Sequence, residues 1–219
     1  MIEFDKIRTI FFDYDGTLHN SIKIYAPAFI KAYDFLVENK LAEPRMWRDE
    51  EISYWLGYNS EEMWKAFMPS LSPELRKTCS GIIGDEMKLQ IEMGLPLLYD
   101  GALETLQYLK NRNYKLIFIS NCKIYYRDAH NKFFNLHNYF DDLICSEEYD
   151  YIQKHEILKK VKSKYKQKMI IIGDRKQDIE AGSMNGIYTI GCKYGFALDG
   201  ELNKADIVIN SITDLKKFL

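Results

Sequence analysis

The sequence lacks three features that would place it in a specialised class of proteins. It has no excess of positive charge, because 30 Lys and Arg residues face 32 Asp and Glu residues, for a net charge of −2. A nucleic-acid partner would need a basic surface against the phosphates, so none is expected. No apolar run approaches the roughly 18 residues of a membrane span, and the N-terminal MIEFDKIRT has no hydrophobic signal segment. We therefore expect a cytoplasmic protein with no membrane partner.

Cysteine is also scarce and scattered. The four cysteines lie far apart and form neither a CxxC pair nor a spacing with His that is typical of metal ligands: Cys79, Cys122, Cys145 and Cys192. Free thiols in a reducing compartment are the simplest interpretation. Cys122 is close to Ser120; we expect it to be an inert bystander, with an oxidation-sensitive role as the alternative.

What the sequence does have is a regular succession of short apolar runs and helical patterns. The apolar runs are rich in Ile, Phe and Val, do not alternate with polar residues, and cover residues 7–12, 114–120, 143–145, 169–173, 187–191 and 206–209. This pattern is typical of strands buried on both faces of a parallel sheet. Helical patterns lie between them, at residues 101–112, 123–136, 153–165, 176–185 and 211–218. The alternation predicts a doubly wound, Rossmann-like α/β domain.

One long stretch interrupts this succession. Residues 22–98 contain no convincing strand, and their apolar residues recur at helical spacing, with four predicted helices. Asp49 is a candidate cap for the second of these helices, and the fourth is expected over residues 73–93. We therefore predict an α/β core domain of residues 1–20 and 99–219, with an inserted all-helical domain of residues 21–98. All three tryptophans fall in the insert, where packing of its own core is expected rather than contact with a substrate.

Polar residues follow three of the predicted strands where each strand ends. These residues are Asp13 and Asp15, Ser120 and Asn121, and Asp174 and Asp178. Because the carboxyl ends of parallel strands meet at one edge of the sheet, we expect these side chains to converge there. Lys154 precedes a predicted helix between the third and fourth strands. Carboxylates suit a hard cation such as Mg²⁺, and the hydroxyl and ammonium groups suit phosphoryl oxygens. The sequence therefore predicts a Mg²⁺–phosphate site.

With these residues in order, the chain resembles the haloacid dehalogenase-like (HAD) superfamily along essentially its whole length. The first family motif, DxDGT, is matched by residues 13–17. Ser120 matches the second motif, Lys154 the third, and GDRKQD at residues 173–178 the fourth, GDxxxD. The helical insert resembles the cap of the phosphoglycolate phosphatase/β-phosphoglucomutase branch. Two positions differ from the usual pattern: Asn20 stands where Asp is common, and His155 where Pro often follows the lysine.

The resemblance implies roles for the four aspartates. Asp13 would attack phosphorus and form an aspartyl phosphate, and Asp15 would act as the general acid and base, for which its pKa should be raised. Mg²⁺ would be bound by a carboxylate oxygen of Asp13, the backbone carbonyl of Asp15, and Asp174. Asp178 would support the metal directly or through water, although a role in capping or orienting the following helix is the alternative for Asp178.

The resemblance also assigns the phosphate-binding residues. Ser120, with Asn121 beside it, and Lys154 would hold the transferring phosphoryl group. For Ser120 and Asn121 the alternative is a simple helix N-cap. For Lys154 the competing candidates are the neighbouring Lys159 and Lys160.

The motifs also discriminate between reactions. Asp15 argues against haloalkanoate dehalogenases and phosphonoacetaldehyde hydrolases, which lack an aspartate there. The text Ser-Asn-Cys-Lys at residues 120–123 favours hydrolysis over the mutase branch. The expected function is a Mg²⁺-dependent phosphatase acting on a small phosphorylated metabolite. The alternatives are a β-phosphoglucomutase-like mutase and a non-catalytic protein that binds phosphometabolites.

Substrate choice is expected to lie in the helical insert. Tyr58 and Asn59 are the candidate specificity residues, with an ordinary turn between helices as the alternative. Hydrolases of this branch act on phosphoglycolate, sugar phosphates, nucleoside monophosphates or pyrophosphate, and the sequence does not choose between these. No dimer signature is visible, so a monomer is expected, with a homodimer as the alternative.

Overall fold

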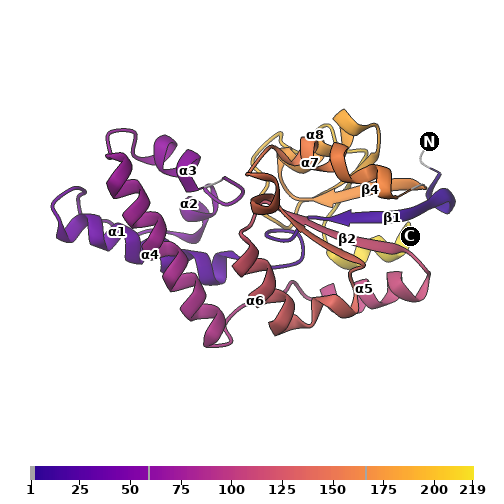
Figure 1. Cartoon of the computed structure of the whole chain (residues 1–219), viewed down its shortest axis with the longest axis horizontal. Helices are drawn as coiled ribbons and strands as arrows, with labels where there is room; N and C mark the ends of the chain where they lie inside the picture. Colours follow the sequence, from indigo (N-terminus) through magenta and orange to yellow (C-terminus); the bar gives the residue numbers. More distant parts are fainter. Residues whose placement is uncertain (1–2, 59, 166) are drawn as a thin grey trace. The chain divides into compact units, whose positions relative to one another are not determined.

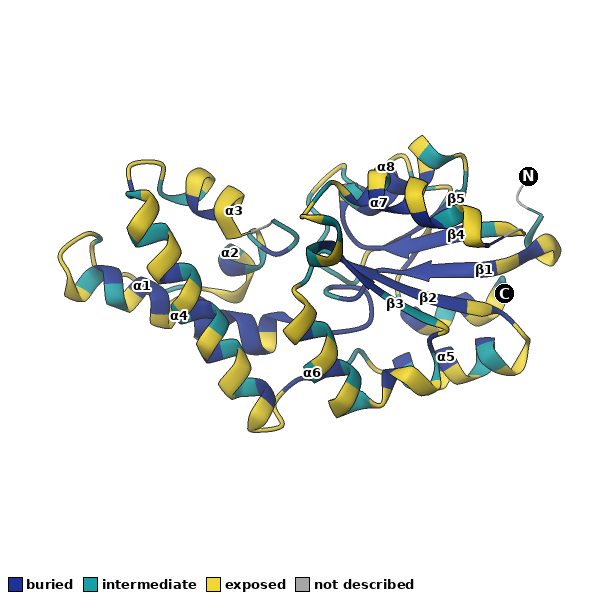
Figure 2. Ribbon diagram, viewed as in Figure 1, coloured by how far each residue is buried: buried dark blue, intermediate teal, exposed yellow. Residues whose placement is uncertain are grey.

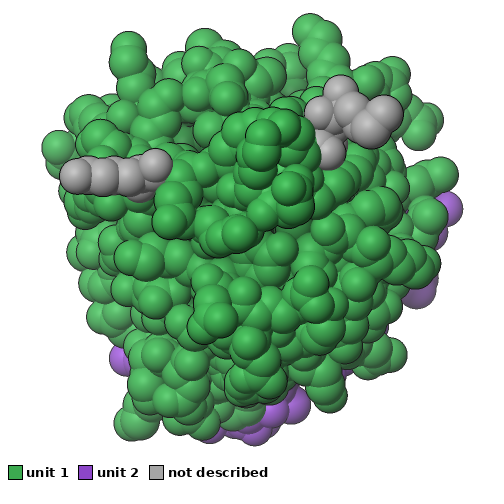
Figure 3. All heavy atoms as spheres, turned by 90° about the vertical axis from the view of Figure 1, so that its right-hand side faces the viewer, with its two compact units in different colours: residues 1–20, 98–219 green, residues 21–97 purple. Residues whose placement is uncertain are grey.

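The computed structural model describes residues 3–58, 60–165 and 167–219 of the chain (Figure 1). The chain divides into two compact units, coloured separately in Figure 3. The larger unit comprises residues 1–20 and 98–219, and the smaller comprises residues 21–97. That the smaller unit works as a cap domain stays a prediction.

A parallel sheet of six strands forms the centre of the larger unit, in the order β3-β2-β1-β4-β5-β6. The strands are β1 (Ile7–Phe12), β2 (Lys115–Ser120), β3 (Asp142–Cys145), β4 (Lys168–Gly173), β5 (Tyr188–Cys192) and β6 (Ile207–Ile209). The register places Phe12 of β1 opposite Phe118 of β2 and Ile172 of β4. All six strands predicted from the apolar runs are confirmed, each with bounds within one residue of the prediction.

Helices cover both faces of this sheet. They are α5 (Ala102–Asn111), α6 (Ile124–Phe134), α7 (Lys154–Val161) and α8 (Lys176–Asn185), with short 3₁₀ segments at Phe4–Lys6, Leu136–Asn138, Ser146–Tyr149, Lys162–Lys164 and Ile212–Lys217. Figure 1 shows α7 and α8 on one face and α5 and α6 on the other. The predicted doubly wound α/β fold is therefore confirmed. The helix expected at residues 211–218 is instead a 3₁₀ segment, whose first turn Ser211 caps by accepting the Thr213 N–H.

The central strands are buried on both faces, which explains why their residues form unbroken apolar runs (Figure 2). In β1 only Arg8 is exposed, while Phe11 and its neighbours are buried. On the face covered by α7, Phe11 packs with Ile171 of β4 and with Ile157 and Leu158. Each such side chain contributes about 1.5–3 kcal/mol by leaving water. This packing holds the carboxyl ends of β1, β2 and β4 side by side.

Within the described residues of the smaller unit, 21–58 and 60–97, the regular secondary structure is helical and no strand is formed. Its helices are α1 (Ile22–Glu38), α2 (Asp49–Ser53), α3 (Ser60–Phe67) and α4 (Pro73–Glu92), and α1 packs along α4. Asp49 is the first residue of α2 rather than its cap, because Arg48 occupies the N-cap position. No helix among the described residues of either unit is long and apolar enough to cross a bilayer.

Aromatic rings build the core of the smaller unit. Phe67 lies 5.6 Å from Trp47, 5.3 Å from Trp55 and 5.7 Å from Trp64, between ring centroids. Phe29 packs against Trp47 at 5.1 Å. The tryptophans therefore pack within their own unit, as expected. The four cysteines are free thiols, also as expected.

Candidate active site

Asp13 stands at the carboxyl end of β1, next to the end of β4. Its backbone N–H donates to the carbonyl of Ile172, at 2.8 Å. This bond extends the β1–β4 pairing by one residue, so Asp13 lies beside Gly173 and Asp174, where β4 ends. The pairing of β1 with β4 therefore brings the first and fourth motifs together.

Three carboxylates converge at this edge of the sheet. Asp13, Asp174 and Asp178 each offer one oxygen, and these oxygens lie within 4.8 Å of one another; all three residues are buried. We call this group the carboxylate cluster. Asp178 also caps α8, because its Oδ2 accepts the N–H of Arg175 at 3.0 Å. Asp178 therefore caps α8 and also lies beside the metal-ligand candidates Asp13 and Asp174.

Lys154, the first residue of α7, reaches into this cluster. Its Nζ donates to Asp13 Oδ1 and to Asp178 Oδ1, at 2.6 Å each. Burial opposes a charged ammonium, but the negative charges of Asp13 and Asp178 raise the pKa of Lys154 above its usual value. Lys159 and Lys160, the competing candidates, are exposed farther along α7. The structure thus brings Lys154 to the site.

The cluster carries more negative charge than Lys154 neutralises. Burial, and then repulsion from Asp178, raise the pKa of Asp13 to about 7 although Lys154 lowers it. Burial, and then the charges of Asp13 and Asp178, raise the pKa of Asp174 well above its ordinary value. A hard divalent cation with oxygen ligands relieves this kind of repulsion. The donor set therefore fits Mg²⁺.

Backbone close to Asp174 fixes the direction of its carboxylate. The N–H of Phe196 donates to Oδ2 at 2.7 Å, and the Thr17 hydroxyl donates to Oδ1 at 3.3 Å. Gly16 has φ +82°, and a Cβ there would lie 2.1 Å from Oδ2. A Cβ on Gly195 would lie 2.5 Å from Asp174 Cβ. Sequence reasoning missed Gly195 and Phe196, because the loop after β5 carries no motif.

Asp15 lies outside the carboxylate cluster and has different neighbours. Its Oδ1 accepts the hydroxyl of Tyr126 at 2.7 Å and lies 3.0 Å from Nδ1 of His19. Burial raises the pKa of Asp15, but the hydrogen bond and charge of His19 and the hydroxyl of Tyr126 outweigh it and hold the pKa below its usual value. The expectation of a raised pKa is therefore wrong for this arrangement, because two donors stabilise the carboxylate. Neither His19 nor Tyr126 was predicted as a site residue.

Ser120 and Asn121 lie where β2 ends. Ser120 is the buried last residue of β2 and pairs with Cys145 of β3. The alternative that these residues cap a helix is wrong, because α6 begins three residues after Asn121 and has Lys123 at its N-cap. Ser120 therefore stands at the same sheet edge as Asp13, with no capping duty.

The candidate specificity residues belong to the smaller unit. Tyr58 precedes α3, and its ring lies 6.3 Å from Tyr54 and 6.0 Å from Trp55. Asn59 lies outside the described residues. Their part in substrate choice stays a prediction.

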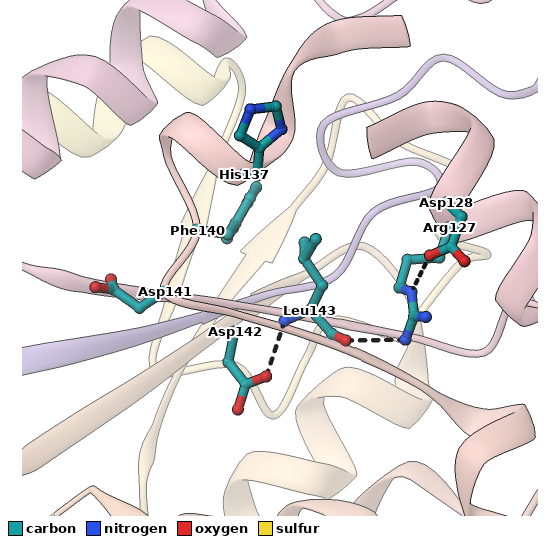
Figure 4. A pocket seen from close by; sticks show the side chains of 7 residues that line it. All are labelled: Arg127, Asp128, His137, Phe140, Asp141, Asp142 and Leu143. Atoms are coloured by element: carbon teal, nitrogen blue, oxygen red, sulfur yellow. Dashed lines mark hydrogen bonds and ion pairs between the residues drawn. The ribbon is translucent and has the colours of Figure 1, made fainter. Parts of the chain in front are cut away.

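A shallow surface pocket of about 390 Å³ lies elsewhere on the larger unit (Figure 4). It is lined by residues of α6, of the segment before β3 and of β3 itself: Arg127, Asp128, His137, Phe140, Asp141, Asp142 and Leu143. None of these is a predicted site residue. The Arg127 guanidinium donates to the Leu143 carbonyl at 3.1 Å and to the Glu148 carboxylate at 2.6 Å. The pocket wall therefore has its own ion pair and is separate from the carboxylate cluster.

Known proteins resemble this chain along most of its length. It is similar to the pyrophosphatase PpaX of Listeria innocua, with 27% identity over 96% of this chain and 95% of that one. Its fold is similar to a haloacid dehalogenase-like family hydrolase from Streptococcus pneumoniae, with a TM-score of 0.81, 22% identity, and coverage of 97% and 98%. A predicted phosphoglycolate phosphatase from Haemophilus somnus also has a TM-score of 0.81, with 19% identity and coverage of 96% and 97%.

The family assignment covers most of the larger unit and all of the smaller one. Residues 10–192 match the family described as haloacid dehalogenase-like hydrolase. This range contains every motif residue from Asp13 to Asp178. The resemblance drawn from the motifs is confirmed, as is the expectation of an enzyme. The chain belongs to the haloacid dehalogenase-like hydrolase family.

Proposed function

We propose that this protein is a Mg²⁺-dependent phosphatase that hydrolyses a small phosphate monoester through an aspartyl phosphate on Asp13. One observation carries the proposal. Asp13, Asp174 and Asp178 are gathered with Lys154 in a buried cluster at the carboxyl edge of the sheet. The three carboxylates do not stabilise the fold of the larger unit, because like charges in a buried site repel one another. The cluster suits a site built to hold a cation and an anionic ligand.

The metal-ligand candidates in this proposal are Asp13, Asp174 and the backbone carbonyl of Asp15, supported by Asp178. When bound, Mg²⁺ supplies charge that shields the anionic nucleophile from the anionic phosphate. Thr17 and the Phe196 N–H keep both oxygens of Asp174 oriented. Orientation by such neighbours is worth roughly 10- to 100-fold in metal affinity.

The protein's own side chains carry the chemical steps. A carboxylate oxygen of Asp13 forms a bond to phosphorus as the bond to the leaving oxygen breaks, and Asp15 donates a proton to that oxygen. The oxygen of water then bonds to phosphorus as the Asp13–phosphorus bond breaks, and Asp15 takes a proton from that water. Lys154 and Ser120 hold the phosphoryl oxygens, whose charge is spread over three positions in the transition state. Lys154 already binds Asp13, so it has little distance to move.

Pyrophosphate is a second candidate substrate. Relatives named pyrophosphatase PpaX from Listeria and Bacillus match 96–98% of this chain at 23–27% identity. Pyrophosphate and a phosphate monoester need the same nucleophile and metal, and differ in the leaving group. Structural neighbours named CbbY, from Rhodobacter sphaeroides, hold phosphate in one structure and xylulose 1,5-bisphosphate in another. These names support a phosphorylated substrate and do not choose between the candidates.

A panel of phosphorylated metabolites and pyrophosphate tests the proposal. We expect phosphate release that requires Mg²⁺ and is abolished by a chelator, with no net isomerisation of sugar phosphates. Isomerised product without released phosphate would identify the mutase alternative. Tight binding of a phosphate ester with no turnover in Mg²⁺ would identify the non-catalytic alternative. The monomeric state and the cytoplasmic location remain predictions, and gel filtration of the same sample tests the first.

A further inference from the structure

The Asp15 carboxylate is held by two buried side chains outside the family motifs' catalytic positions. Tyr126, in the first turn of α6, and His19, in the loop after β1, both contact the same oxygen, Oδ1. The Tyr126 hydroxyl also lies 3.2 Å from His19 Nδ1, which closes a triangle of polar atoms. Oδ1 accepts in both contacts when the Nδ1 that faces it carries a hydrogen, which leaves Oδ2 to carry the proton that Asp15 donates. The Asp15 side chain itself is 26% exposed.

Aromatic packing immobilises both of these side chains. Tyr14, His19, Tyr126 and His130 form a buried group that we call the Tyr–His cluster. The ring of His130 lies 4.2 Å from Tyr126 and 4.6 Å from His19, between centroids. The Tyr14 hydroxyl lies 2.6 Å from Nδ1 of His130. Because these rings lock one another, Tyr126 and His19 present their polar atoms to Asp15 in one fixed geometry.

The two contacts leave the second oxygen of Asp15 available. Among residues 3–58, 60–165 and 167–219, no hydrogen bond to Asp15 Oδ2 is formed. A carboxylate fixed through one oxygen by two donors has a defined direction for the other oxygen. Proton transfer needs that direction, because the donor and acceptor atoms must come within hydrogen-bond distance of each other.

We propose that Tyr126 and His19 are positioning residues that aim Asp15 Oδ2 at the leaving-group oxygen of the substrate. The inference rests on the proposed phosphatase function. In the first step the Asp13–phosphorus bond forms, the bond from phosphorus to the leaving oxygen breaks, and the proton passes from Asp15 to that oxygen. In the second step the oxygen of water bonds to phosphorus, the Asp13–phosphorus bond breaks, and the proton returns from that water to Asp15. Tyr126 and His19 hold Asp15 throughout and exchange no proton with the substrate.

The consequence is measurable because only poor leaving groups need the proton. A p-nitrophenolate leaves without protonation, whereas a p-methylphenolate of nearly the same shape benefits from it. For Tyr126→Phe we expect kcat/KM, which reports the steps up to formation of the aspartyl phosphate, to fall roughly 10- to 100-fold on p-methylphenyl phosphate, within the range of general acid catalysis. On p-nitrophenyl phosphate we expect kcat/KM to change by less than about threefold, since its leaving group needs no proton in that step. The comparison uses kcat/KM because kcat also contains hydrolysis of the aspartyl phosphate, in which Asp15 acts for both substrates.

Two further variants serve as controls. Tyr165→Phe removes another tyrosine hydroxyl from an aspartate of the same unit, since Tyr165 donates to Asp142 Oδ2 at 2.9 Å. It should lower stability slightly and treat both substrates alike. His19→Phe should resemble Tyr126→Phe, whereas His19→Asn should recover much of the activity, because its amide N–H lies near the place of Nδ1. Thermal unfolding by circular dichroism establishes that each variant is folded.

The outcomes separate this inference from the proposed function. If Tyr126→Phe lowers kcat/KM equally for both aryl phosphates, or for neither, the positioning role is wrong. If the wild type hydrolyses neither ester, or Asp13→Asn remains active, the phosphatase proposal itself fails. If Asp15→Asn discriminates between the two esters and Tyr126→Phe does not, the general acid stands and only the positioning role falls.

Discussion

The two aspartates of the first motif are two residues apart and have opposite surroundings. Asp13 lies in the carboxylate cluster, where burial and Asp178 raise its pKa to about 7. Asp15 lies against the Tyr–His cluster, where donors outweigh burial and lower its pKa. Neighbours from distant parts of the chain therefore decide the behaviour of each carboxylate. In the metal-free protein both pKa shifts are opposite to what a nucleophile, which must be ionised, and a general acid, which must be protonated, require. The proposed mechanism therefore needs a bound cation to lower the pKa of Asp13 and an anionic substrate to raise the pKa of Asp15.

The largest effect should come from removing the nucleophile. Asp13→Asn keeps the shape of the side chain and its place beside Lys154, but not the attacking oxygen anion. We expect activity to fall at least about 1000-fold, as is usual when a covalent nucleophile is lost. Mass spectrometry of acid-quenched reactions should show an added phosphoryl group in the wild type and none in the variant. A phosphoryl group on another residue would contradict the assignment of Asp13.

The second-largest effect should be the loss of stability when Lys154 is replaced. Lys154→Met removes the ammonium group that contacts Asp13 and Asp178, and breaking a buried ion pair costs about 3–5 kcal/mol. Urea unfolding without Mg²⁺ measures this loss. Added Mg²⁺ should restore more stability to the variant than to the wild type, because the cation then neutralises the same carboxylates. Lys159→Met, at an exposed position of α7, is the matched control and should change stability little.

A pair of glycines separates backbone strain from damage to Asp174. Gly16 and Gly200 have nearly the same φ, +82° and +83°, but a Cβ on Gly16 would lie 2.1 Å from Asp174 Oδ2, whereas on Gly200 the nearest atom is at 3.6 Å. Both Ala variants should lose about 1–2 kcal/mol of stability from the left-handed backbone. Only Gly16→Ala should weaken Mg²⁺ binding, by roughly 10- to 100-fold. Calorimetric titration with Mg²⁺ measures the difference, and equal affinities would contradict the close approach.

The smallest effect is the change in stability per unit of pH, and its sign differs between the two aspartates. A raised pKa means that folded Asp13 binds more protons than unfolded Asp13 between pH 3.8 and about 7, so its contribution to stability falls as pH rises through that range. The slope is at most about 1.4 kcal/mol per pH unit for one proton. The lowered pKa of Asp15 acts in reverse, since its stabilisation is present above the unfolded value and is lost as pH falls through the folded one.

Urea unfolding of the metal-free protein at several pH values measures this contrast. Asp13→Asn should remove the fall in stability toward neutral pH, and Asp15→Asn should remove the loss at acidic pH. If the two substitutions changed the slope of stability against pH in the same direction, the two carboxylates would not differ as their surroundings indicate.

The local amino-acid sequence was enough to predict the strands of the sheet. The unbroken Ile and Phe runs predict strands buried on both faces, and the structure places them within one residue of the expected bounds. The same holds for the candidate ligands, because a residue directly after a parallel strand must emerge at the carboxyl edge. Asp13, Ser120 and Asp174 follow from this rule. Arg48, which takes the N-cap place expected for Asp49, shows that helix starts are less well marked.

The surroundings of those residues depend on contacts between distant segments. Tyr126 and Phe196 carry no local signal, since each reaches its aspartate from another helix or loop. His19 lies only four residues after Asp15 but belongs to no motif. In the motif, Asp13 and Asp15 are both simply acidic residues that follow the first strand. The packing of α6, α7 and the loop after β5 places like charges next to Asp13 and hydrogen-bond donors next to Asp15. Free energies of ionisation depend on burial and on charges a few ångströms away, and those distances are set by the folded chain.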